Sequence, residues 1–404
     1  MNKNIWIINQ YTGSPYHGMN YRSYYLAKEF VKKGYEVTIF SGSYSHLFQN
    51  LPKTKGIFTN EKIDGINYIW IKTPKYKKSK SVGRVFNMII FMILLFFINI
   101  FKMKKPDKII ISSLSLFPVV NAYLWSKLLK INFIFEIRDM WPQTLIELGG
   151  VSQKNPLVLI MKFFEKFGYK KAQYVVSLLP NTKDYMIDNG MTSNKFYYIP
   201  NGSVDDKINN HLLDDQLKKK IPSNKFIVGY AGTIGIANAL EYLIDVAILL
   251  KNNDKIFFVI TGDGGKKEEL SSKCQMNGLK NIVFIDAVQK QEIPSLLELY
   301  DVCYIGWHKN SLYKFGISAN KIFEYMINNK PIIHSYSGSK DPVLEANCGW
   351  TVKSEDIEAL KNIIIETSHL SKEELKRLGR NAHQYVLQYH DYTIIANQYE
   401  ELLI

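Results

Sequence analysis

Short apolar segments, each followed by a turn and then by a helical pattern, recur in both halves of this chain. In the first half, NIWII at residues 4–8 leads into a loop, a helical pattern that ends at Gly34, and the apolar segment YEVTIF. In the second half, KFIVGYAG at residues 225–232 leads into the helical pattern TIGIANALEYLIDVAILL. A strand, a helix and a second strand form a βαβ unit, and such units build parallel sheets that are covered by helices. The sequence therefore predicts an α/β protein with doubly wound parallel sheets.

The length of the chain indicates two such domains. With 404 residues, it is longer than one ordinary hydrophobic core supports. Pro200, Asn201 and Gly202 form a strong turn signal between the two halves. We expect a first domain over residues 1–202, a second domain over residues 203–385 and a final helix over residues 386–404.

The chain is strongly basic, with a formal net charge of +14, which indicates an acidic partner: nucleic acid, anionic lipid or a phosphorylated substrate. The apolar segment VFNMIIFMILLFFINIF at residues 85–101 favours lipid, because basic residues flank it on both sides. Those residues are Lys72, Lys75, Lys77, Lys78, Lys80, Arg84, Lys102, Lys104, Lys105 and Lys108.

This apolar segment is slightly shorter than the roughly 20 residues of a spanning helix. We expect a membrane-associating segment over residues 72–108, with a helix that lies in the interface and lysines on anionic headgroups. A buried crossover helix with solvated charges is an equal alternative, and a true span is a third. The three cysteines have no paired spacing, which fits a reducing cytosol and argues against a disulfide framework or a zinc site.

The segment GISANKIFEYMINNKP at residues 316–331 carries the strongest chemical signal. Ser318 or Asn320 could cap the helix that begins here, and its free N–H groups together with Lys321 would form an anion site. Glu324 follows one turn later, where a carboxylate could accept hydrogen bonds from two adjacent ribose hydroxyls. A diphosphate site beside a diol acceptor indicates a nucleotide sugar. The alternative from spacing alone is a capped helix with a surface Lys–Glu pair.

The run SANKIFEYMINNKPII resembles the donor-binding signature of the retaining GT-B glycosyltransferases of family four. The resemblance extends over nearly the whole chain and implies two Rossmann-like domains, with a C-terminal helix that crosses back to the first. It also implies that Lys321 lies by the donor diphosphate and that Glu324 holds the ribose. Where the family often has a further glutamate, this chain has Gly316, so that a sugar contact would come from backbone, Lys314 or Ser318. The form YKFGISANKIFEYM resembles the branch that transfers N-acetyl-L-fucosamine and related amino-deoxy sugars in bacterial surface polysaccharides.

The resemblance implies a donor site in the second domain, where three glycine-containing turns follow strands. The basic residue often found in the first of these turns is replaced by Ala237 or Asn238, so the diphosphate charge would fall more on Lys321. The expected donor-binding residues are Gly232, Thr233, Asn238, Gly262, Asp263, Gly264, Val288, Gly316, Ile317, Ser318, Asn320, Lys321 and Glu324.

In the first domain, the resemblance implies residues that face the acceptor and the reacting sugar. EIRDMWPQT at residues 136–144 matches the family form, and we carry over Arg138 and Asp139, with Lys321, as catalytic. The alternative for Asp139 is a helix cap. In the loop HGMNYR we expect His17, Gly18 and Arg22 on the acceptor side, although Gly18 could serve the turn alone.

Together these features predict a retaining glycosyltransferase that moves an amino-deoxy sugar from a UDP-sugar to a lipid-diphosphate-linked acceptor at the inner face of the cytoplasmic membrane. No cofactor or metal is expected, because no Asp-x-Asp follows a strand, and no nucleic acid partner is expected. One alternative is a nucleotide-sugar enzyme such as an epimerase, with His17 and Asp139 as the acid–base pair. Another is a membrane-surface binding protein with a degenerate site, for which Gly316 is the motivation.

Overall fold

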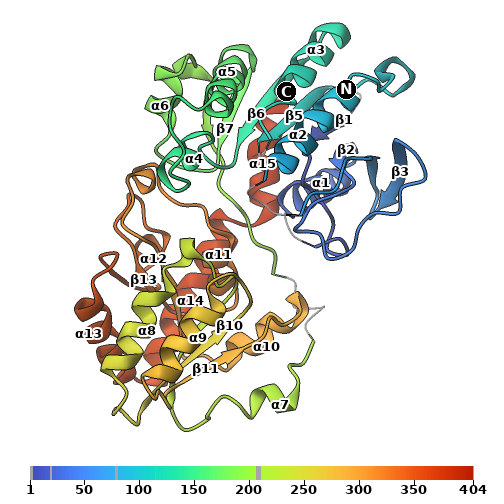
Figure 1. Cartoon of the computed structure of the whole chain (residues 1–404). Helices are drawn as coiled ribbons and strands as arrows, with labels where there is room; N and C mark the ends of the chain where they lie inside the picture. The colour runs from blue at the N-terminus through green and yellow to red at the C-terminus, as the bar shows by residue number, and fades with distance from the viewer. Residues whose placement is uncertain (1–2, 19–20, 78–80, 114, 206–210, 404) are drawn as a thin grey trace. The chain divides into compact units, whose positions relative to one another are not determined.

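The computed structural model describes residues 3–18, 21–77, 81–113, 115–205 and 211–403. The chain forms two compact units, each with its own sheet (Figure 1). Unit 1 comprises Met1–Asn201 and Tyr392–Ile404, and unit 2 comprises Gly202–Asp391. Both are α/β, as the recurring strand and helix patterns predict.

Unit 1 contains an eight-stranded sheet in the order β3-β4-β2-β1-β5-β6-β7-β8. The strands are β1 (Asn4–Ile8), β2 (Glu36–Gly42), β3 (Phe58–Ile63), β4 (Ile66–Ile71), β5 (Lys108–Ser113), β6 (Asn132–Ile137), β7 (Tyr174–Ser177) and β8 (Phe196–Tyr198). All neighbouring pairs are parallel except β3 and β4. Every residue of β1 is buried, which explains its uninterrupted apolar sequence.

The antiparallel edge strand β3 is an addition to the predicted parallel sheet. It is joined to β4 by Asp64 and Gly65, whose φ angles of 48° and 83° are both positive. This is the backbone of a tight hairpin turn, and Asp-Gly is among the sequences that adopt it most readily. The strand residues themselves are mostly exposed and polar, so they lack the apolar pattern that indicates a buried strand.

The helices of unit 1 are α1 (Arg22–Lys32), α2 (Val82–Leu95), α3 (Val119–Leu129), α4 (Gln143–Glu147), α5 (Pro156–Lys171), α6 (Lys183–Asp188) and the C-terminal α15 (Tyr392–Leu403). Two sets of them pack together. Helix α15 packs against α1. Helices α2, α3 and α5 lie side by side: Asn121 of α3 donates to the Met92 carbonyl oxygen of α2 at 3.1 Å, and Tyr123 of α3 contacts Phe167 of α5.

The apolar segment 85–101 is not one continuous helix. Helix α2 ends at Leu95, and a short 3-10 turn follows at Ile100–Lys102. Asn87, Phe91 and Leu95 form a buried stripe, so α2 is in part the crossover helix between β4 and β5. Among the described residues, no helix is both long and apolar enough to cross a membrane. Lys78 and Lys80, two of the predicted flanking lysines, lie outside the described residues.

Unit 2 contains a six-stranded parallel sheet in the order β11-β10-β9-β12-β13-β14. The strands are β9 (Phe226–Ala231), β10 (Ile256–Thr261), β11 (Ile282–Ile285), β12 (Val302–Gly306), β13 (Ile332–Ser335) and β14 (Gly349–Val352). The helices are α7 (Asp215–Lys218), α8 (Leu240–Leu249), α9 (Lys267–Met276), α10 (Ile293–Glu298), α11 (Asn320–Ile327), α12 (Pro342–Glu345), α13 (Ile357–Ser368) and α14 (Lys372–Tyr389).

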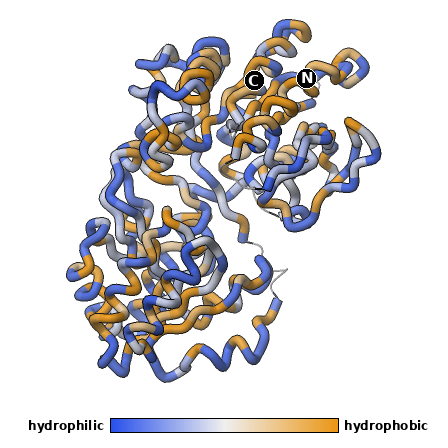
Figure 2. The backbone as a smooth tube through the Cα atoms, in the orientation of Figure 1, coloured by the Kyte–Doolittle hydropathy of each residue, from blue (hydrophilic) through white to orange (hydrophobic). Residues whose placement is uncertain are grey.

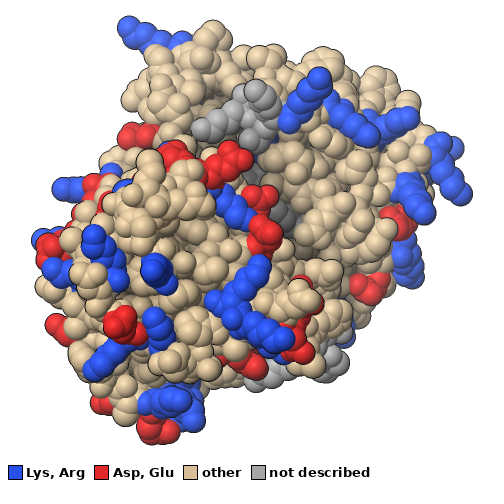
Figure 3. Space-filling view, turned by 60° about the horizontal axis from the view of Figure 1, so that its bottom comes forward, with Lys and Arg blue, Asp and Glu red and all other residues tan. Residues whose placement is uncertain are grey.

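The apolar residues of both units are concentrated on the strands and on the inner sides of the helices (Figure 2). In unit 2, one core cluster lies on each side of the sheet: Val228 and Tyr230 of β9 belong to one, and Ile227 and Ala231 belong to the other. Figure 3 shows the charged side chains of one face. In some areas Lys and Arg alternate with Asp and Glu, and in other areas Lys and Arg are surrounded by uncharged residues.

The order of the strands in unit 2 predicts where a ligand would bind. Strand β9 lies between β10 on one side and β12 on the other, so the chain direction across the sheet changes at β9. Ligands of open α/β sheets bind outside the carboxyl ends of the strands at such a point. The turn at Gly232, the turn at Gly262 and the loop before α11 all leave from these ends.

Candidate active site

Helix α11, which carries the predicted donor motif, is tied to the end of strand β9 by Tyr325. The Tyr325 hydroxyl donates to the Ala231 carbonyl oxygen at 2.9 Å and lies 2.8 Å from the Ala231 amide nitrogen, which donates to it. Tyr325 is buried, and burial raises its pKa well above the usual tyrosine value, so the hydroxyl stays protonated. Because Lys321 lies one helical turn before Tyr325, this bridge places the lysine over the turn that follows β9.

Lys321 lies against the glycine-rich turn with two side-chain partners. Its ammonium group donates to the Tyr230 hydroxyl and to Asn238 Oδ1, the latter at 3.2 Å. The Tyr230 hydroxyl in turn donates to the Thr233 carbonyl oxygen at 2.5 Å, and Asn238 Nδ2 donates to the same oxygen at 2.9 Å. Lys321, Asn238 and Thr233, three of the predicted donor residues, therefore form one hydrogen-bonded group.

The charge state of Lys321 is sensitive to what binds beside it. Burial lowers the pKa of Lys321 to about 7, although the Glu324 carboxylate acts in the opposite direction. Both hydrogen-bond partners of its ammonium group are neutral, so the lost hydration is offset only in part, by the Glu324 carboxylate. A diphosphate at this position would supply a further anion and favour the charged lysine.

Gly232 is required by the position of Lys321. A Cβ atom at Gly232 would lie 2.4 Å from Lys321 Cε and 2.6 Å from Nζ, and the φ of Gly232 is +147°. Any larger residue would therefore displace the lysine and strain the turn.

Gly262 and Gly264 allow the turn after β10 to pack against the turn after β9. A Cβ at Gly262 would lie 1.8 Å from the Gly232 carbonyl oxygen, and one at Gly264 would lie 2.3 Å from the Ile234 carbonyl oxygen. The Ile234 amide donates to the Asp263 carbonyl oxygen at 2.8 Å, which joins the two turns directly. Three of the predicted glycines thus form one backbone surface at the sheet's carboxyl edge.

Asp263 and Val288 lie at neighbouring strand ends. The exposed Asp263 carboxylate accepts from the Gly264 amide at 2.8 Å, which orders the turn. Val288 is partly buried against the core. Between them, Asp286 pairs with Lys267 at 2.5 Å. This is the edge where the resemblance places the nucleotide base, and the role of Val288 stays a prediction.

The start of α11 differs from the predicted capped helix. The helix begins at Asn320 and its N-cap residue is Ala319, so neither Ser318 nor Asn320 occupies the predicted N-cap position. Ala319 has extended backbone and no polar side chain, and its carbonyl oxygen accepts from the Ile322 amide at 3.2 Å. The amides of Asn320 and Lys321 precede that bond, and they are the ones that an anion at the helix N-terminus would meet.

The residues around this start have different environments. Gly316 has a φ of 88°, which disfavours the family's glutamate at this position, and Ile317 is buried. Glu324 is partly exposed, and among the described residues no hydrogen bond to its carboxylate is found. It could therefore accept from a ligand's hydroxyls, as predicted.

In unit 1, the end of β6 carries a buried ion pair beside the predicted residues. Arg22 Nε lies 2.8 Å from Glu136 Oε2, and both side chains are almost fully buried. Glu136 also accepts from Ser112 at 2.6 Å and from Tyr399 of the C-terminal helix α15. Burial alone would raise the pKa of Glu136, but the Arg22 and Arg138 guanidinium groups and these hydrogen bonds bring it down to about 2.

Arg22 is therefore not where the resemblance predicts it. Its remaining donors bind the Pro200 and Ile199 carbonyl oxygens at 2.5 and 3.1 Å, so its guanidinium is occupied inside unit 1. A side chain with these partners has no free surface for an acceptor. The arginine instead joins α1, β6 and the chain just before unit 2.

Arg138 and Asp139 follow the same strand but are more accessible. The Arg138 side chain is half-buried and its amide donates to Ser113 Oγ at 3.3 Å, whereas Asp139 is exposed. Asp139 does not serve as the N-cap of α4, which begins at Gln143 after Pro142, so the helix-cap alternative is not supported. Their catalytic roles stay predictions.

His17 and Gly18 occupy an internal turn. His17 is 1% exposed, its Nδ1 lies 2.9 Å from Ser14 Oγ, and its ring contacts Trp70. Gly18 has a φ of 80°, so its conformation alone explains the glycine. The burial of His17 is at odds with an acceptor-side position. It also removes support for a His17–Asp139 acid–base pair, because the His17 ring is enclosed.

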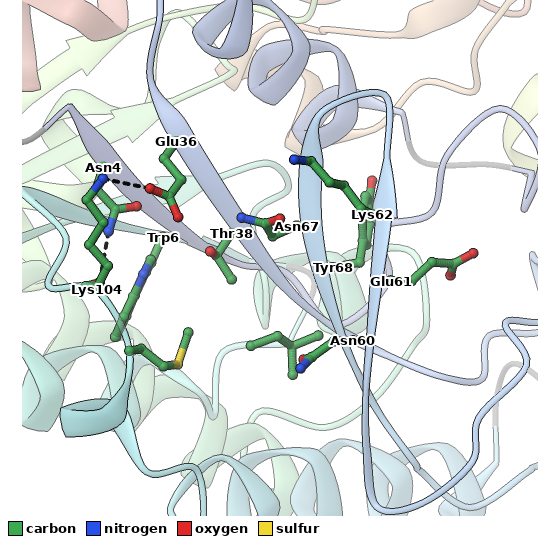
Figure 4. Close-up of a pocket in the computed structure, with 12 residues that line it drawn as sticks. Asn4, Trp6, Glu36, Thr38, Asn60, Glu61, Lys62, Asn67, Tyr68 and Lys104 are labelled. Atoms are coloured by element: carbon green, nitrogen blue, oxygen red, sulfur yellow. Dashed lines mark hydrogen bonds and ion pairs between the residues drawn. The ribbon is translucent and has the colours of Figure 1, made fainter.

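A cavity of unit 1 is lined by other residues than these. It has a volume of about 380 Å³ and is lined by residues such as Asn4, Glu36 and Asn67, near the amino ends of β1, β2 and β4 (Figure 4). Ligands of such sheets bind at the opposite ends. Across the described parts of the chain, no group of three or more His, Cys, Asp or Glu side chains is placed to hold a metal ion.

Three site residues were not identified from the sequence. Tyr230 and Tyr325 sit within apolar segments, where a tyrosine gives no separate signal from the core residues around it. His308, after β12, lies with Nε2 3.0 Å from the Ile236 carbonyl oxygen and 3.3 Å from Glu241 Oε1. It connects the loop before α11 with the glycine-rich turn, a contact that spacing in the chain could not predict.

Two protein families match this chain, one for each half. Residues 16–206 match Glycosyltransferase Family 4, and residues 214–385 match Glycosyl transferases group 1. The two parallel-sheet units have the fold of the GT-B glycosyltransferases, and each half of the chain is similar to a family of glycosyltransferases.

One relative of known name matches about three fifths of this chain. A glycosyl transferase of Escherichia coli (strain K12), WcaI, which is assigned by name to colanic acid biosynthesis, is 27% identical over 252 residues. The match spans 60% of this chain and 61% of that relative.

Solved structures resemble the whole chain. Sucrose-phosphate synthase from Thermosynechococcus elongatus has a TM-score of 0.75 at 16% identity, covering 99% of this chain and 98% of that one. Anabaena Alr3699/HepE, solved in complex with UDP and glucose, has a TM-score of 0.67 at 17% identity, covering 99% of both chains. At these identities, the structural likeness supports the fold.

Proposed function

We propose that this protein is a retaining glycosyltransferase that uses a UDP-sugar. It would move N-acetylfucosamine or a related amino-deoxy sugar to a lipid-linked saccharide acceptor, in the synthesis of a bacterial surface polysaccharide such as O-antigen or capsule. The acceptor would bring the enzyme to the inner face of the cytoplasmic membrane, where the basic segment 72–108 would contact anionic lipid. The donor site lies in unit 2, and no metal ion is required.

The observation that carries this proposal is the position of Lys321 over Gly232, with Asn238 as its partner. In the reaction, the bond between the anomeric carbon and the diphosphate oxygen breaks, and UDP leaves with additional negative charge. Lys321 and the first amides of α11 are fixed donors that could stabilise this charge without rearrangement. A new bond then forms from the acceptor hydroxyl oxygen to the anomeric carbon, and the hydroxyl proton passes to the departing diphosphate.

Further support comes from Glu324 and from relatives. The carboxylate of Glu324 lies one turn after Lys321 on α11, at a spacing that suits a ribose beside a diphosphate. Structures of Anabaena Alr3699/HepE contain UDP and UDP-glucose, and WcaI is assigned to the synthesis of a polysaccharide. A uridine nucleotide and a glycan product are therefore the first candidates for this chain.

The direct test is product analysis. Purified protein is incubated with a panel of UDP-sugars and an undecaprenyl-diphosphate-linked saccharide, and the products are identified by mass. We expect one added sugar that depends on both substrates. A changed donor without acceptor would favour an epimerase-type enzyme, and inertness with lipid binding would favour a non-catalytic membrane protein.

A second test addresses the ribose assignment. Glu324→Ala should weaken UDP binding by roughly 1.5–3 kcal/mol, because the diol loses a charged acceptor. Glu366→Ala is the control, since that exposed glutamate lies on α13 of the same unit. Equal UDP affinity of Glu324→Ala and wild type by calorimetry would exclude this role.

A further inference from the structure

Helices α2, α3 and α5 of unit 1 present large apolar side chains to solvent. Each helix packs one stripe against the sheet and leaves another outward. The outward side chains include Phe86 on α2 and Phe97 two residues after its end (54% and 71% exposed), Leu128 on α3 (58%), and Leu159 and Phe163 on α5 (54% and 62%). We call the surface formed by these residues the α2–α3–α5 face, after the three adjacent helices, which are labelled in Figure 1.

The three helices form one continuous layer. Asn121 of α3 bonds to the backbone of α2, and the rings of Phe117 and Phe164 meet at 5.2 Å between the segment before α3 and α5. The inner stripes, such as Asn87 and Phe91 of α2 and Met161 of α5, are buried. The exposed stripes therefore do not result from a helix that fails to pack. Contiguous exposed apolar side chains on a folded domain indicate a contact surface.

The exposed charges of α3 and α5 have one sign. Exposed lysines lie at the C-terminal end of α3 (Lys127 and Lys130) and in the second half of α5 (Lys166, Lys170 and Lys171), whereas the last turn of α2 has no basic residue. The three helices, all of whose residues are described, contain a single acidic residue, Glu165, which is 1% exposed. Lysines at helix C-termini also interact well with the helix dipole, but that effect does not account for exposed phenylalanines beside them.

Exposed apolar side chains together with exposed lysines indicate the kind of partner. A protein partner would match the apolar side chains, but its surface would need acidic groups at each lysine. An anionic bilayer offers both parts at once, because headgroups attract lysines and the acyl boundary accepts apolar side chains. The Lys127 and Lys171 ammonium groups also lie 5.7 and 5.6 Å from the centre of the Tyr123 ring, so an amphipathic aromatic side chain stands among the lysines.

We propose that the α2–α3–α5 face is a docking surface for an anionic lipid bilayer. This docking surface rests on the proposed function in one respect, because an acceptor that is linked to lipid would require the enzyme to bind the membrane. It goes beyond the segment 72–108, because α3 and α5 lie outside that segment and provide part of the surface. Binding then depends on both helices as much as on α2.

The test uses variants of α3 and α5 only. An apolar variant carries Leu128→Ser and Phe163→Ser, and a charge variant carries Lys127→Ser, Lys166→Ser and Lys170→Ser. Flotation is measured with vesicles of phosphatidylglycerol and phosphatidylcholine in equal parts, and with phosphatidylcholine alone. We expect the charge variant to bind the anionic vesicles roughly a hundredfold more weakly. The apolar variant should lose roughly tenfold or more.

Matched controls come from unit 2. Leu249→Ser with Met276→Ser removes two exposed apolar side chains, and Lys251→Ser with Lys280→Ser and Lys376→Ser removes three exposed charges. Both controls should bind as wild type does. Circular dichroism and thermal unfolding establish that every variant is folded.

Other results would overturn the proposal. If the α3 and α5 variants bind anionic vesicles as tightly as wild type, the face is not the docking surface. A face that instead mediates self-association would give a concentration-dependent dimer, lost in Phe163→Ser, without vesicle binding. Transfer of sugar to a water-soluble acceptor analogue is measured in parallel: its absence with intact vesicle binding would reject the proposed function and leave the docking surface standing.

Discussion

The Tyr325 hydroxyl bridges both backbone groups of Ala231, at 2.9 Å to the carbonyl oxygen and 2.8 Å to the amide nitrogen. The two residues are 94 positions apart in the chain. Through this bridge, the helix that carries Lys321 and Glu324 is held at the end of the strand that leads into Gly232. The donor motif and the glycine-rich turn are thus one rigid element.

Removing the bridge should weaken both stability and ligand binding. Tyr325→Phe leaves buried backbone groups of Ala231 without their partner, at a cost of about 1–3 kcal/mol in the free energy of unfolding. UDP affinity should fall as well, because α11 is less firmly placed. Denaturant unfolding and calorimetry measure the two effects. Tyr389→Phe, at a tyrosine 48% exposed, should change neither, and an unchanged Tyr325→Phe protein would contradict the assigned bridge.

Binding of UDP should take up a proton at Lys321. Burial holds the pKa of this lysine at about 7 in the free protein, and a bound diphosphate would raise it. Affinity should therefore be greatest below pH 7 and decline as the pH rises above it. Calorimetry in buffers of different ionisation enthalpy should detect the proton, and the signal should vanish in Lys321→Met. A pH-independent affinity would show that no titrating group meets the diphosphate.

Lys321 should also make the free energy of unfolding depend on pH, with the opposite sign: stability should rise with pH where the affinity for UDP falls. Its folded pKa of about 7 lies below the ordinary value of 10.5, so the folded state binds fewer protons between these two values. The lysine destabilises the fold fully below pH 7, and this cost is relieved as the pH rises toward 10.5. Unfolding of Lys321→Met should lack this rise in stability, and Lys251→Met, at an exposed lysine, serves as the control.

Gly232→Ala should abolish tight UDP binding with little loss of helix content. The added Cβ would meet Lys321 Cε at 2.4 Å in a turn whose φ is +147°, so the lysine must move. Gly265→Ala is a close control, because a Cβ there has no neighbour within 4 Å. Calorimetry with UDP should show a large loss for the first variant and none for the second. Equal affinities would mean that the turn does not contact the nucleotide.

Glu136→Gln should destabilise unit 1 in a pH-dependent way. The pKa of Glu136 is about 2 in the fold, against an ordinary 4.5, so its stabilisation is complete above about pH 4.5 and is lost as the pH falls toward 2. Breaking this buried pair should cost roughly 3–5 kcal/mol at neutral pH, because Arg22 is left without its carboxylate. Unfolding between pH 2 and 7 checks both statements. Glu373→Gln, at an exposed pair with Arg380, should have little effect.

The apolar strands, the glycine turns and the donor motif could be read from the sequence because each depends on neighbouring residues. Even the missed strand β3 had a local signal, since Asp64 and Gly65 form a turn sequence typical of hairpins. The predicted cap of α11 was wrong for a related reason: Ser318 and Asn320 are both suitable types, but the helix begins one residue past Ala319. Residue type alone does not fix the first helical residue.

The tertiary structure decided which polar groups meet. Arg22 is 114 positions from Glu136, and Tyr399 is 263 positions from it, yet the three share one buried cluster. That cluster encloses the Arg22 side chain within unit 1. The sequence by itself determined the α/β plan and the position of Lys321 and Glu324 on one helix, because short-range patterns specify strands and helices. Contacts between distant segments arise only when those elements pack, and burial then determines which side chains keep a surface for ligands.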